Sequence, residues 1–199
     1  MNNKILNPNR ELQSYIIGIA LGDGNLSKPN RGAVRLRISC DKKYPFLYQK
    51  IFNSLKLLLP DNKVSLVDRG SGCLDISVYS NHLEKLLEWK AKKGSKFLQR
   101  VGIPSWVKSN NKYKVNCLRG LIETDGCIYI DRGYKMVIFK SIIPNLTRDF
   151  YNMMISLNFY PHLYKIKPDK RIYNQRIAYH VRLSKNVSEF LELVKPEKT

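Results

Sequence analysis

The sequence predicts an α+β protein built from two similar halves, and three observations predict it. An apolar segment at residues 15–24 contains an internal glycine and ends in Asp-Gly, and residues 117–126 repeat this arrangement. The internal glycines and the aspartates of the two copies are each 102 residues apart, which indicates an internal repeat. The stretches after both copies show strand-like alternation and helix-like spacing in the same order.

The two repeated segments are expected to be buried helices that pack closely in parallel. They are apolar nearly all round, and small residues recur on one face at i, i+4 spacing, which lets helix backbones approach each other. These small residues are Gly18, Gly22, Gly120 and Thr124. The packing would place Asp23 and Asp125 side by side as two buried acids, which repel each other unless a cation such as Mg²⁺ lies between them. A single Asp-Gly pair also closes ordinary buried helices, but two matched copies favour the cation site.

Each half is predicted to run helix, two strands, helix, two strands, helix. In the first half we expect elements at residues 11–22, 34–39, 41–59, 64–67, 73–79 and from 81 onward, with the start of the first strand and a loop at 25–32. In the second half we expect them at residues 115–124, 128–130, 135–141, 147–157, 164–167, 175–183 and 187–194. Gly24 and Gly126 suit a left-handed residue at the end of each first helix, and Asn81 suits a helix N-cap. The predicted domains are residues 1–95, a basic linker at 96–114, and residues 115–199.

The charge balance points to a polyanionic partner. The chain has 35 Lys and Arg residues against 16 Asp and Glu residues, a formal net charge of +19. Nucleic acid is the default partner for such an excess, although charge alone does not separate DNA from RNA. In the strand at 34–39, Val34, Leu36 and Ile38 are expected to face the core, which leaves Arg35 and Arg37 on the open face.

The cysteines and the N-terminal residues indicate an intracellular protein. The four cysteines show no CxxC pairing, so neither a zinc site nor a disulfide framework is expected. Residues 1–10 lack the apolar core of a secretory signal, and no apolar run is long enough to span a bilayer. We therefore expect the cytoplasm, nucleoid or an organelle matrix, and no membrane partner.

The two segments resemble the motif of the LAGLIDADG homing endonucleases, in the single-chain form with two motifs. Residues 118–126 read Leu-Arg-Gly-Leu-Ile-Glu-Thr-Asp-Gly; residues 16–24 match more loosely, with Leu21 where an acid often stands. The resemblance covers essentially the whole chain. It implies two αββαββα halves, with the motif helices at the centre and antiparallel sheets forming a DNA-binding saddle. It also implies a monomer that hydrolyses both strands of a long, non-palindromic double-stranded DNA site.

The resemblance also assigns roles to particular residues. Asp23 and Asp125 would be catalytic metal ligands, and the backbone carbonyls of Gly22 and Thr124 are further candidate ligands for Mg²⁺, Mn²⁺ or Ca²⁺. Lys96 matches the place of an active-site lysine, and its counterpart in the second half would be Lys198, with Lys195 as the fallback. The residues expected to contact DNA are Asn25, Lys28, Arg31, Arg35, Arg37, Ser39, Arg69, Ser77, Tyr79, Lys140, Lys165, Lys167, Arg176, His180 and Arg182.

Two alternatives remain open from the sequence. The same fold serves in intron maturases, which bind intron RNA and assist splicing without cutting DNA. It would also suit a cleavage-inactive DNA-binding protein.

A non-palindromic DNA target is expected because the open faces of the two halves differ. The first half carries Arg35 and Arg37 where the second is expected to carry Val137 and Phe139.

Overall fold

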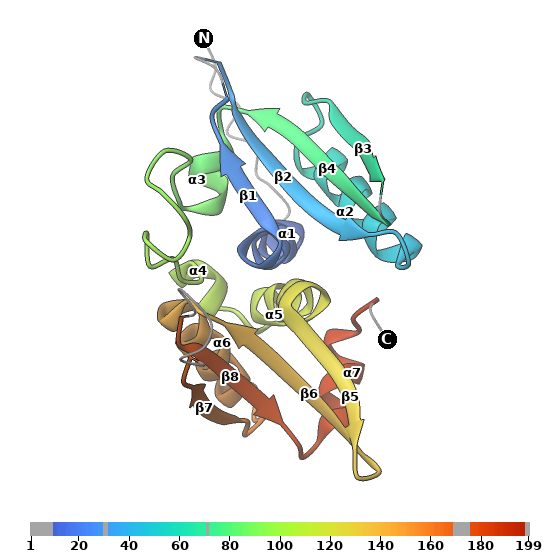
Figure 1. Ribbon diagram of the computed structural model, residues 1–199, viewed down its shortest axis with the longest axis vertical. Coiled ribbons are helices and arrows are strands. Elements are labelled where there is room, and N and C mark those ends of the chain that lie inside the picture. Colours follow the sequence, from blue (N-terminus) through green and yellow to red (C-terminus); the bar gives the residue numbers. More distant parts are fainter. Residues whose placement is uncertain (1–9, 30–31, 71, 169–175, 198–199) are drawn as a thin grey trace.

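The computed structural model describes residues 10–29, 32–70, 72–168 and 176–197, which form two halves stacked on either side of a central helix pair (Figure 1). The first half comprises α1 (Arg10–Gly22), β1 (Gly24–Ser27), β2 (Val34–Asp41), α2 (Pro45–Leu58), β3 (Val64–Gly70), β4 (Cys73–Ser80) and α3 (Leu83–Leu87). After the short helix α4 (Ser105–Lys108), the second half comprises α5 (Asn111–Asp125), β5 (Gly126–Asp131), β6 (Tyr134–Ser141), α6 (Pro144–Ser156), β7 (His162–Ile166), β8 (Ala178–Leu183) and α7 (Val187–Val194). The predicted α+β fold and the duplicated element order are confirmed.

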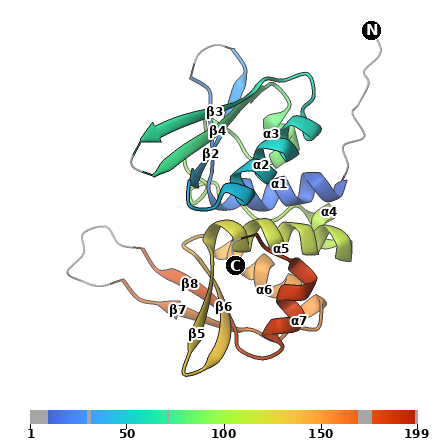
Figure 2. The ribbon, with the colours of Figure 1, turned by 90° about the vertical axis from the view of Figure 1, so that its right-hand side faces the viewer.

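Each half contains one four-stranded antiparallel sheet. The strand orders are β1-β2-β4-β3 and β5-β6-β8-β7, so the two sheets have the same topology. Helices cover one face of each sheet, and the other face is open (Figures 1 and 2). The predicted alternation in β2 is confirmed, because Val34, Leu36 and Ile38 are buried in the core while Arg35 and Arg37 lie on the opposite face.

The helices α1 and α5 meet at almost the smallest separation that two backbones allow. A Cβ atom added to Gly18 would lie 2.3 Å from the carbonyl oxygen of Cys117, and one added to Gly120 would lie 2.6 Å from that of Tyr15. A Cβ atom on Gly22 would lie 2.0 Å from Oγ1 of Thr124. Gly18 meets Cys117 and, one turn later in α1, Gly22 meets Thr124, so residue numbers rise in the same direction along both helices and the pair is parallel. Figure 2 shows the two helices side by side. The predicted small-residue face is therefore the interface between the halves.

Gly24 and Gly126 contradict their predicted role. Neither has a positive φ, and Gly126 is extended at φ −86° and ψ 154° as the first residue of β5. A Cβ atom on either residue would lie 2.5 Å from a carbonyl oxygen of the preceding helix, that of Ala20 or of Ile122. Glycine is required because each strand begins directly against the last turn of its helix. The predicted cap at Asn81 is also wrong, since His82 precedes α3 and makes no side-chain capping bond.

The segment between the halves packs against the core. Trp89, Val101, Ile103 and Val107 are buried, although lysines surround them in sequence. The Asn110 side chain caps α5 by accepting hydrogen bonds from the backbone N–H groups of Lys112 and Tyr113. The helix therefore begins at Asn111, four residues before the start that the sequence suggests.

The first hairpin of the second half is one residue shorter than that of the first. Gly24 pairs with Ile38 in the first sheet, and Gly126 pairs with Phe139 in the second. The constant offset of 102 therefore fails inside β6, and the structural counterparts of Arg35 and Arg37 are Met136 and Ile138. Val137 and Phe139, with which the sequence compares them, are buried in the core. The open faces of the two halves still differ.

No helix in the described ranges has the length and apolar character that a membrane crossing requires.

Replacing Gly18 or Gly120 with alanine is expected to lower the free energy of unfolding by about 1–3 kcal/mol, because the methyl group forces the backbones apart. Alanine would otherwise favour a helix, so a loss of stability is diagnostic of the close contact. Gly32→Ala is the matched control, since no atom lies within 4 Å of the position that a Cβ atom would take there. Urea denaturation measures all three variants, and equal stability among them would contradict the close packing of the two helices.

Candidate functional site

The repeated aspartates lie where the two central helices end. Gly22 contacts Thr124 across the interface, so the next residues in each chain segment, Asp23 and Asp125, emerge at the same end of the helix pair. Lys96 lines one cavity with Asp125 and donates hydrogen bonds to the carbonyls that directly precede Asp23, and the negative charges of both aspartates act on its amine. Asp23 is exposed and Asp125 is partly exposed, so the expectation of two buried acids is wrong. The helices are buried, but their C-terminal ends reach the surface where the two sheets begin.

Lys96 joins this site from the segment between the halves. Its Nζ donates hydrogen bonds to the carbonyl oxygens of the last three residues of α1, which are Ala20 (3.1 Å), Leu21 (2.6 Å) and Gly22. A cation is favoured there because the unpaired carbonyls form the negative end of the helix dipole. Burial lowers the pKa of Lys96 to about 8, although the negative charges of Asp125 and Asp23 act in the opposite direction.

The donor set suits a hard divalent cation. Two carboxylates and nearby backbone carbonyls are the oxygen ligands that Mg²⁺, Mn²⁺ and Ca²⁺ accept. Among the described residues, no group of three or more His, Cys, Asp or Glu side chains is placed to hold a metal ion. The remaining ligands would therefore be backbone carbonyls, water or substrate oxygens. The carbonyl of Gly22 already accepts a hydrogen bond from Lys96.

The lysine expected from the second half is not located by the structure. Lys198 lies outside the described residues. Lys195, the fallback, is exposed and ends α7 in a left-handed conformation with φ 47°. The neighbouring carbonyl of Val194 accepts a hydrogen bond from Arg119, which is in the middle of α5.

On the first sheet, an acid organises several of the residues expected to contact DNA. The buried Asp75 on β4 accepts hydrogen bonds from Arg69 at 2.6 Å and Ser39 at 2.8 Å, and it lies 3.9 Å from Nε of Arg37. These pairs hold the pKa of Asp75 below its usual value in spite of burial, which acts to raise it. Ser77 shares the open face, as the partner of Arg37 in the β2–β4 ladder.

The other first-half residues of that set lie along β1, β2 and β4. Asn25 pairs with Arg37, and Arg35 donates a hydrogen bond to Ser27 at 3.2 Å. Tyr79 is 46% exposed, and Lys28 is exposed beyond the end of β1. Arg31 lies outside the described residues.

On the second sheet, the structure separates the expected residues between two faces. Lys140 pairs with His180, and Arg182 pairs with Ile138, so Lys140, His180 and Arg182 share the open face. Lys165 pairs with Tyr179 on the same face as the buried Val181, which is the helix-covered face, and its Nζ lies 5.8 Å from the Tyr179 ring centroid. Arg176 precedes β8, and Lys167 is exposed after β7.

Two buried arginine nitrogens lie in matching rows of the two open faces. Nε of Arg37 and Nε of Arg182 are buried and have no hydrogen-bond acceptor among the described residues. Arg37 pairs with Ser77, and Arg182 pairs with Ile138, the structural counterpart of Arg37. Buried donors usually have a partner, so each Nε is an unsatisfied polar group beneath an open face that carries other basic residues.

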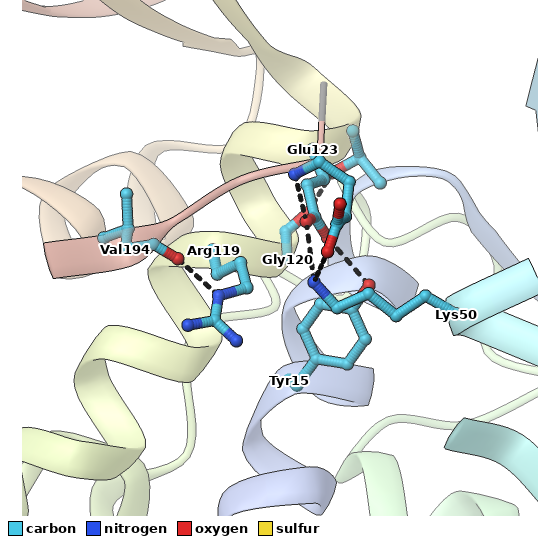
Figure 3. Close-up of polar contacts among 8 residues, drawn as sticks. Tyr15, Lys50, Arg119, Gly120, Glu123 and Val194 are labelled. Carbon is cyan, nitrogen blue, oxygen red and sulfur yellow. Dashed lines mark hydrogen bonds and ion pairs between the residues drawn. The ribbon is translucent and has the colours of Figure 1, made fainter. Parts of the chain in front are cut away.

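A polar cluster fastens the halves together on the other side of α5 (Figure 3). The side chain of Glu123 is fully buried, and its carboxylate accepts hydrogen bonds from the Tyr15 hydroxyl at 2.7 Å, from Lys50 Nζ at 3.2 Å and from the backbone N–H of Glu197 at 2.9 Å. Burial and the Glu123 carboxylate raise the pKa of Tyr15 well above its usual value. Tyr15 and Lys50 belong to the first half and Glu123 to the second, so the cluster joins them.

The sequence analysis missed Glu123, Lys50 and Asp75. A lone acid within an apolar helix signals Glu123, but its partner Lys50 is 73 residues away and cannot be found from spacing. Asp75 follows the alternation of β4 on a face otherwise rich in arginine, which is a detectable signal for a cross-strand ion pair.

The fold and the site together define a single-chain protein of two duplicated halves, with one acid from each half at the end of a shared helix interface. A family model described as a LAGLIDADG-like domain matches residues 112–195. A comparison with curated proteins found no match.

Several solved structures share the fold. The homing endonuclease I-DmoI in complex with DNA and Mn superposes with a TM-score of 0.66 at 18% identity, covering 93% of this chain and 96% of that chain. A mesophilic variant of I-DmoI gives a TM-score of 0.67 at 18% identity, covering 93% and 95%. Full-length DUF199/WhiA from Thermatoga maritima gives 0.63 at 13% identity, covering 96% of this chain and 57% of that one.

The second half of the chain thus matches the LAGLIDADG-like domain model, and the chain as a whole has the two-domain fold seen in I-DmoI.

Removing the Lys50 ammonium group, which binds the buried Glu123, is expected to destabilise the protein. Lys50→Met should lower the free energy of unfolding by about 3 kcal/mol, because it leaves the buried Glu123 carboxylate without its counter-ion. Lys56→Met, an exposed change on the same helix, serves as the control.

The double variant Lys50→Met, Glu123→Leu is expected to recover more than half of that loss, since Leu21 already stands buried at the equivalent place in α1. Urea denaturation of the natural protein, the Lys50→Met and Glu123→Leu single variants and the double variant measures the coupling energy between the two side chains. A Lys50→Met variant as stable as its control would show that the ion pair does not hold the halves together.

Proposed function

We propose that the protein is a metal-dependent endonuclease that cuts both strands of a double-stranded DNA site lacking twofold symmetry. The observation that carries the proposal is the convergence of Asp23, Asp125 and Lys96 at the shared end of α1 and α5. Two sheets with arginine and lysine on their open faces extend from this end on either side (Figure 2). Each half thus supplies one acid and one binding face.

The net charge and the open faces support binding to DNA. A formal net charge of +19 favours the phosphate backbone, and such binding weakens as salt concentration rises. Arg37 and Arg182 lie on the open faces of the two sheets, and guanidinium groups read guanine in the major groove. The complex of I-DmoI with DNA and Mn, which has the same fold, is consistent with this partner.

Asp23 and Asp125 would hold divalent cations, with the carbonyls of Gly22 and Thr124 as further candidate ligands. Bound Mg²⁺ or a similar ion supplies an acidified water and neutralises charge on the leaving oxygen. The residues of the chain perform the remaining tasks. The glycine contacts between α1 and α5 keep the two carboxylates together, and Lys96 places a positive charge beside them. That charge would stabilise the crowded phosphate, because it is fixed before the reaction begins.

The open faces of the halves support a target without twofold symmetry. In matching rows, the first half carries Arg37 and Ser77, whereas the second carries the buried Ile138 and Arg182. Different side chains at equivalent places read different base pairs. A single chain with both halves also supports action as a monomer.

The test of the proposal is cleavage by purified protein. A library of duplexes, including the sequences that flank the gene joined without it, is incubated with Mg²⁺ or Mn²⁺, and the new DNA ends are sequenced. Cuts at one site on both strands are expected, and EDTA should abolish them. Metal-independent cutting, or tight binding of structured RNA with no DNA cut at any metal concentration, would refute the proposal.

Asp23→Asn and Asp125→Asn are each expected to lower the cleavage rate by roughly a thousandfold while duplex affinity changes little, because each removes a metal ligand and spares the open faces. Asp61→Asn, the same change at an exposed turn, should cut normally. Single-turnover cleavage and a gel-shift assay measure the two quantities. Full activity of either aspartate variant would remove these residues from the mechanism.

Lys96→Met is expected to tighten Mn²⁺ binding in the absence of DNA by about three- to tenfold, because it removes a like charge from beside the two carboxylates. The same variant should cut DNA more slowly. Lys93→Met, exposed in the same segment, should leave both unchanged. Isothermal titration calorimetry with MnCl₂ measures the affinity, and weaker binding by Lys96→Met would contradict the placement of this amine.

A further inference from the structure

A cavity of about 430 Å³ opens beside Asp125, between the second sheet and the segment that carries Lys96. Three of its lining residues are cations, Lys96, Lys140 and Arg176, and His180 lines it as well. Asp125 is the single acid among the lining residues. A hollow of this charge and size favours an anion such as a phosphate group over a neutral ligand.

The basic groups of the cavity are held by the fold. Lys140 on β6 and His180 on β8 are direct partners in the antiparallel ladder, so their side chains leave the same face of the sheet. The His180 ring packs edge-on against Tyr164 with centroids 5.3 Å apart. Burial and then the positive charge of Lys140 lower the pKa of His180, which shows that the two groups are close.

Arg176 reaches the cavity from the residues before β8. Its guanidinium carbon lies 4.0 Å from the ring centroid of Phe97, the neighbour of Lys96. This stacking joins the second sheet to the connecting segment and directs a planar, five-donor group towards the cavity. Within the described ranges, neither Arg176 nor Lys140 forms an ion pair with a carboxylate, so their charge is not neutralised there.

The equivalent row of the first half has the opposite character. Since Ile38 corresponds to Phe139, Ser39 corresponds to Lys140, and Asp75 corresponds to His180. Asp75 is bound to Arg69 and Ser39 and lies beside Arg37, so the basic groups there are already engaged by a carboxylate. One half thus presents uncompensated cations next to its catalytic aspartate, and the other presents a neutralised cluster.

We propose that Lys140, Arg176 and His180 form a phosphate-binding site beside Asp125 for one strand of the duplex, so that the two strands are held unequally. This inference rests on the proposed endonuclease function. Arg176 offers paired donors to phosphate oxygens, and Lys140 adds a point charge, while His180 offers a ring N–H. The binding of this DNA strand would depend on the side chains of Lys140, Arg176 and His180, which the other strand would not contact.

Strand-resolved cleavage tests the unequal binding. A target duplex carrying a different dye on each strand is cut by the full-length protein and by Lys140→Gln and Arg176→Gln variants. Each variant is expected to slow the cutting of one and the same strand by at least roughly tenfold, the effect of losing one charged donor, so that singly nicked duplex accumulates. Lys185→Gln, exposed between β8 and α7, should cut both strands normally. Equal slowing of both strands, or of neither, overturns the inference.

A measurement without cleavage separates this inference from the proposed function. Inorganic phosphate is titrated into the protein without DNA or metal, and the imidazole NMR signals of His82, His162 and His180 are followed. The His180 signals should shift to saturation in the natural sequence and barely move in the Lys140→Gln, Arg176→Gln double variant, whereas those of the other two histidines should stay in place. No shift at His180, or similar shifts at all three, overturns the phosphate site even where the protein cuts DNA. A saturating His180 shift in a protein that cuts no DNA supports the site and refutes the nuclease proposal alone.

Discussion

The backbone contact between α1 and α5 is the constraint on which the rest of the structure depends. Gly18 and Gly120 leave no room for a side chain, so the separation of the two helices is fixed by their peptide groups. Everything that emerges from the ends of these helices inherits that separation, including Asp23, Asp125 and the first strand of each sheet. Because no flexible side chain lies between the backbones, a shift of one helix must move the other helix with it. A site made from two halves of one chain needs such an interface, since each half contributes a single acid.

The two halves share a topology but have diverged in their polar groups. At the last buried position before the repeated aspartate, α1 carries Leu21 and α5 carries Glu123, and of these two residues only Glu123 requires polar partners from other elements. On the sheets, Asp75 draws arginines together, whereas its counterpart His180 stands beside Lys140. These differences lie on both sides of the interface, which itself stays nearly symmetric. Duplication explains the frame, and divergence in the buried and open-face polar residues explains why the two faces are chemically distinct.

The features of the fold that follow local periodicity could be predicted from the sequence. The alternation of Val34, Leu36 and Ile38 and the small-residue face of the central helices could be predicted because each repeats at short range. The paired Asp-Gly segments could be predicted because several of their residues recur at one constant offset. The single-residue shortening of the second hairpin could not be predicted, so the sequence compares Val137 and Phe139 with the arginines although they face the core. Partners far apart in sequence, such as Lys50 and Glu123, leave no spacing signal. The convergence of Lys96 on the last turn of α1 could be anticipated only through family resemblance, because one lysine among many carries no pattern of its own.

The attachment of Glu197 to Glu123 limits how modular the protein is. The backbone N–H of Glu197 and the ammonium group of Lys50 share one carboxylate oxygen, and Glu197 itself pairs with Lys50 at 3.1 Å. Glu197, which follows α7 in the second half, is thus bound to Lys50 on α2 of the first half. A chimera that exchanges residues 1–95 for the matching part of a relative would keep Glu123 and Glu197 but lose their partners in the first half. It would need a cation at the place of Lys50 and a hydroxyl at the place of Tyr15, or an apolar residue substituted for Glu123.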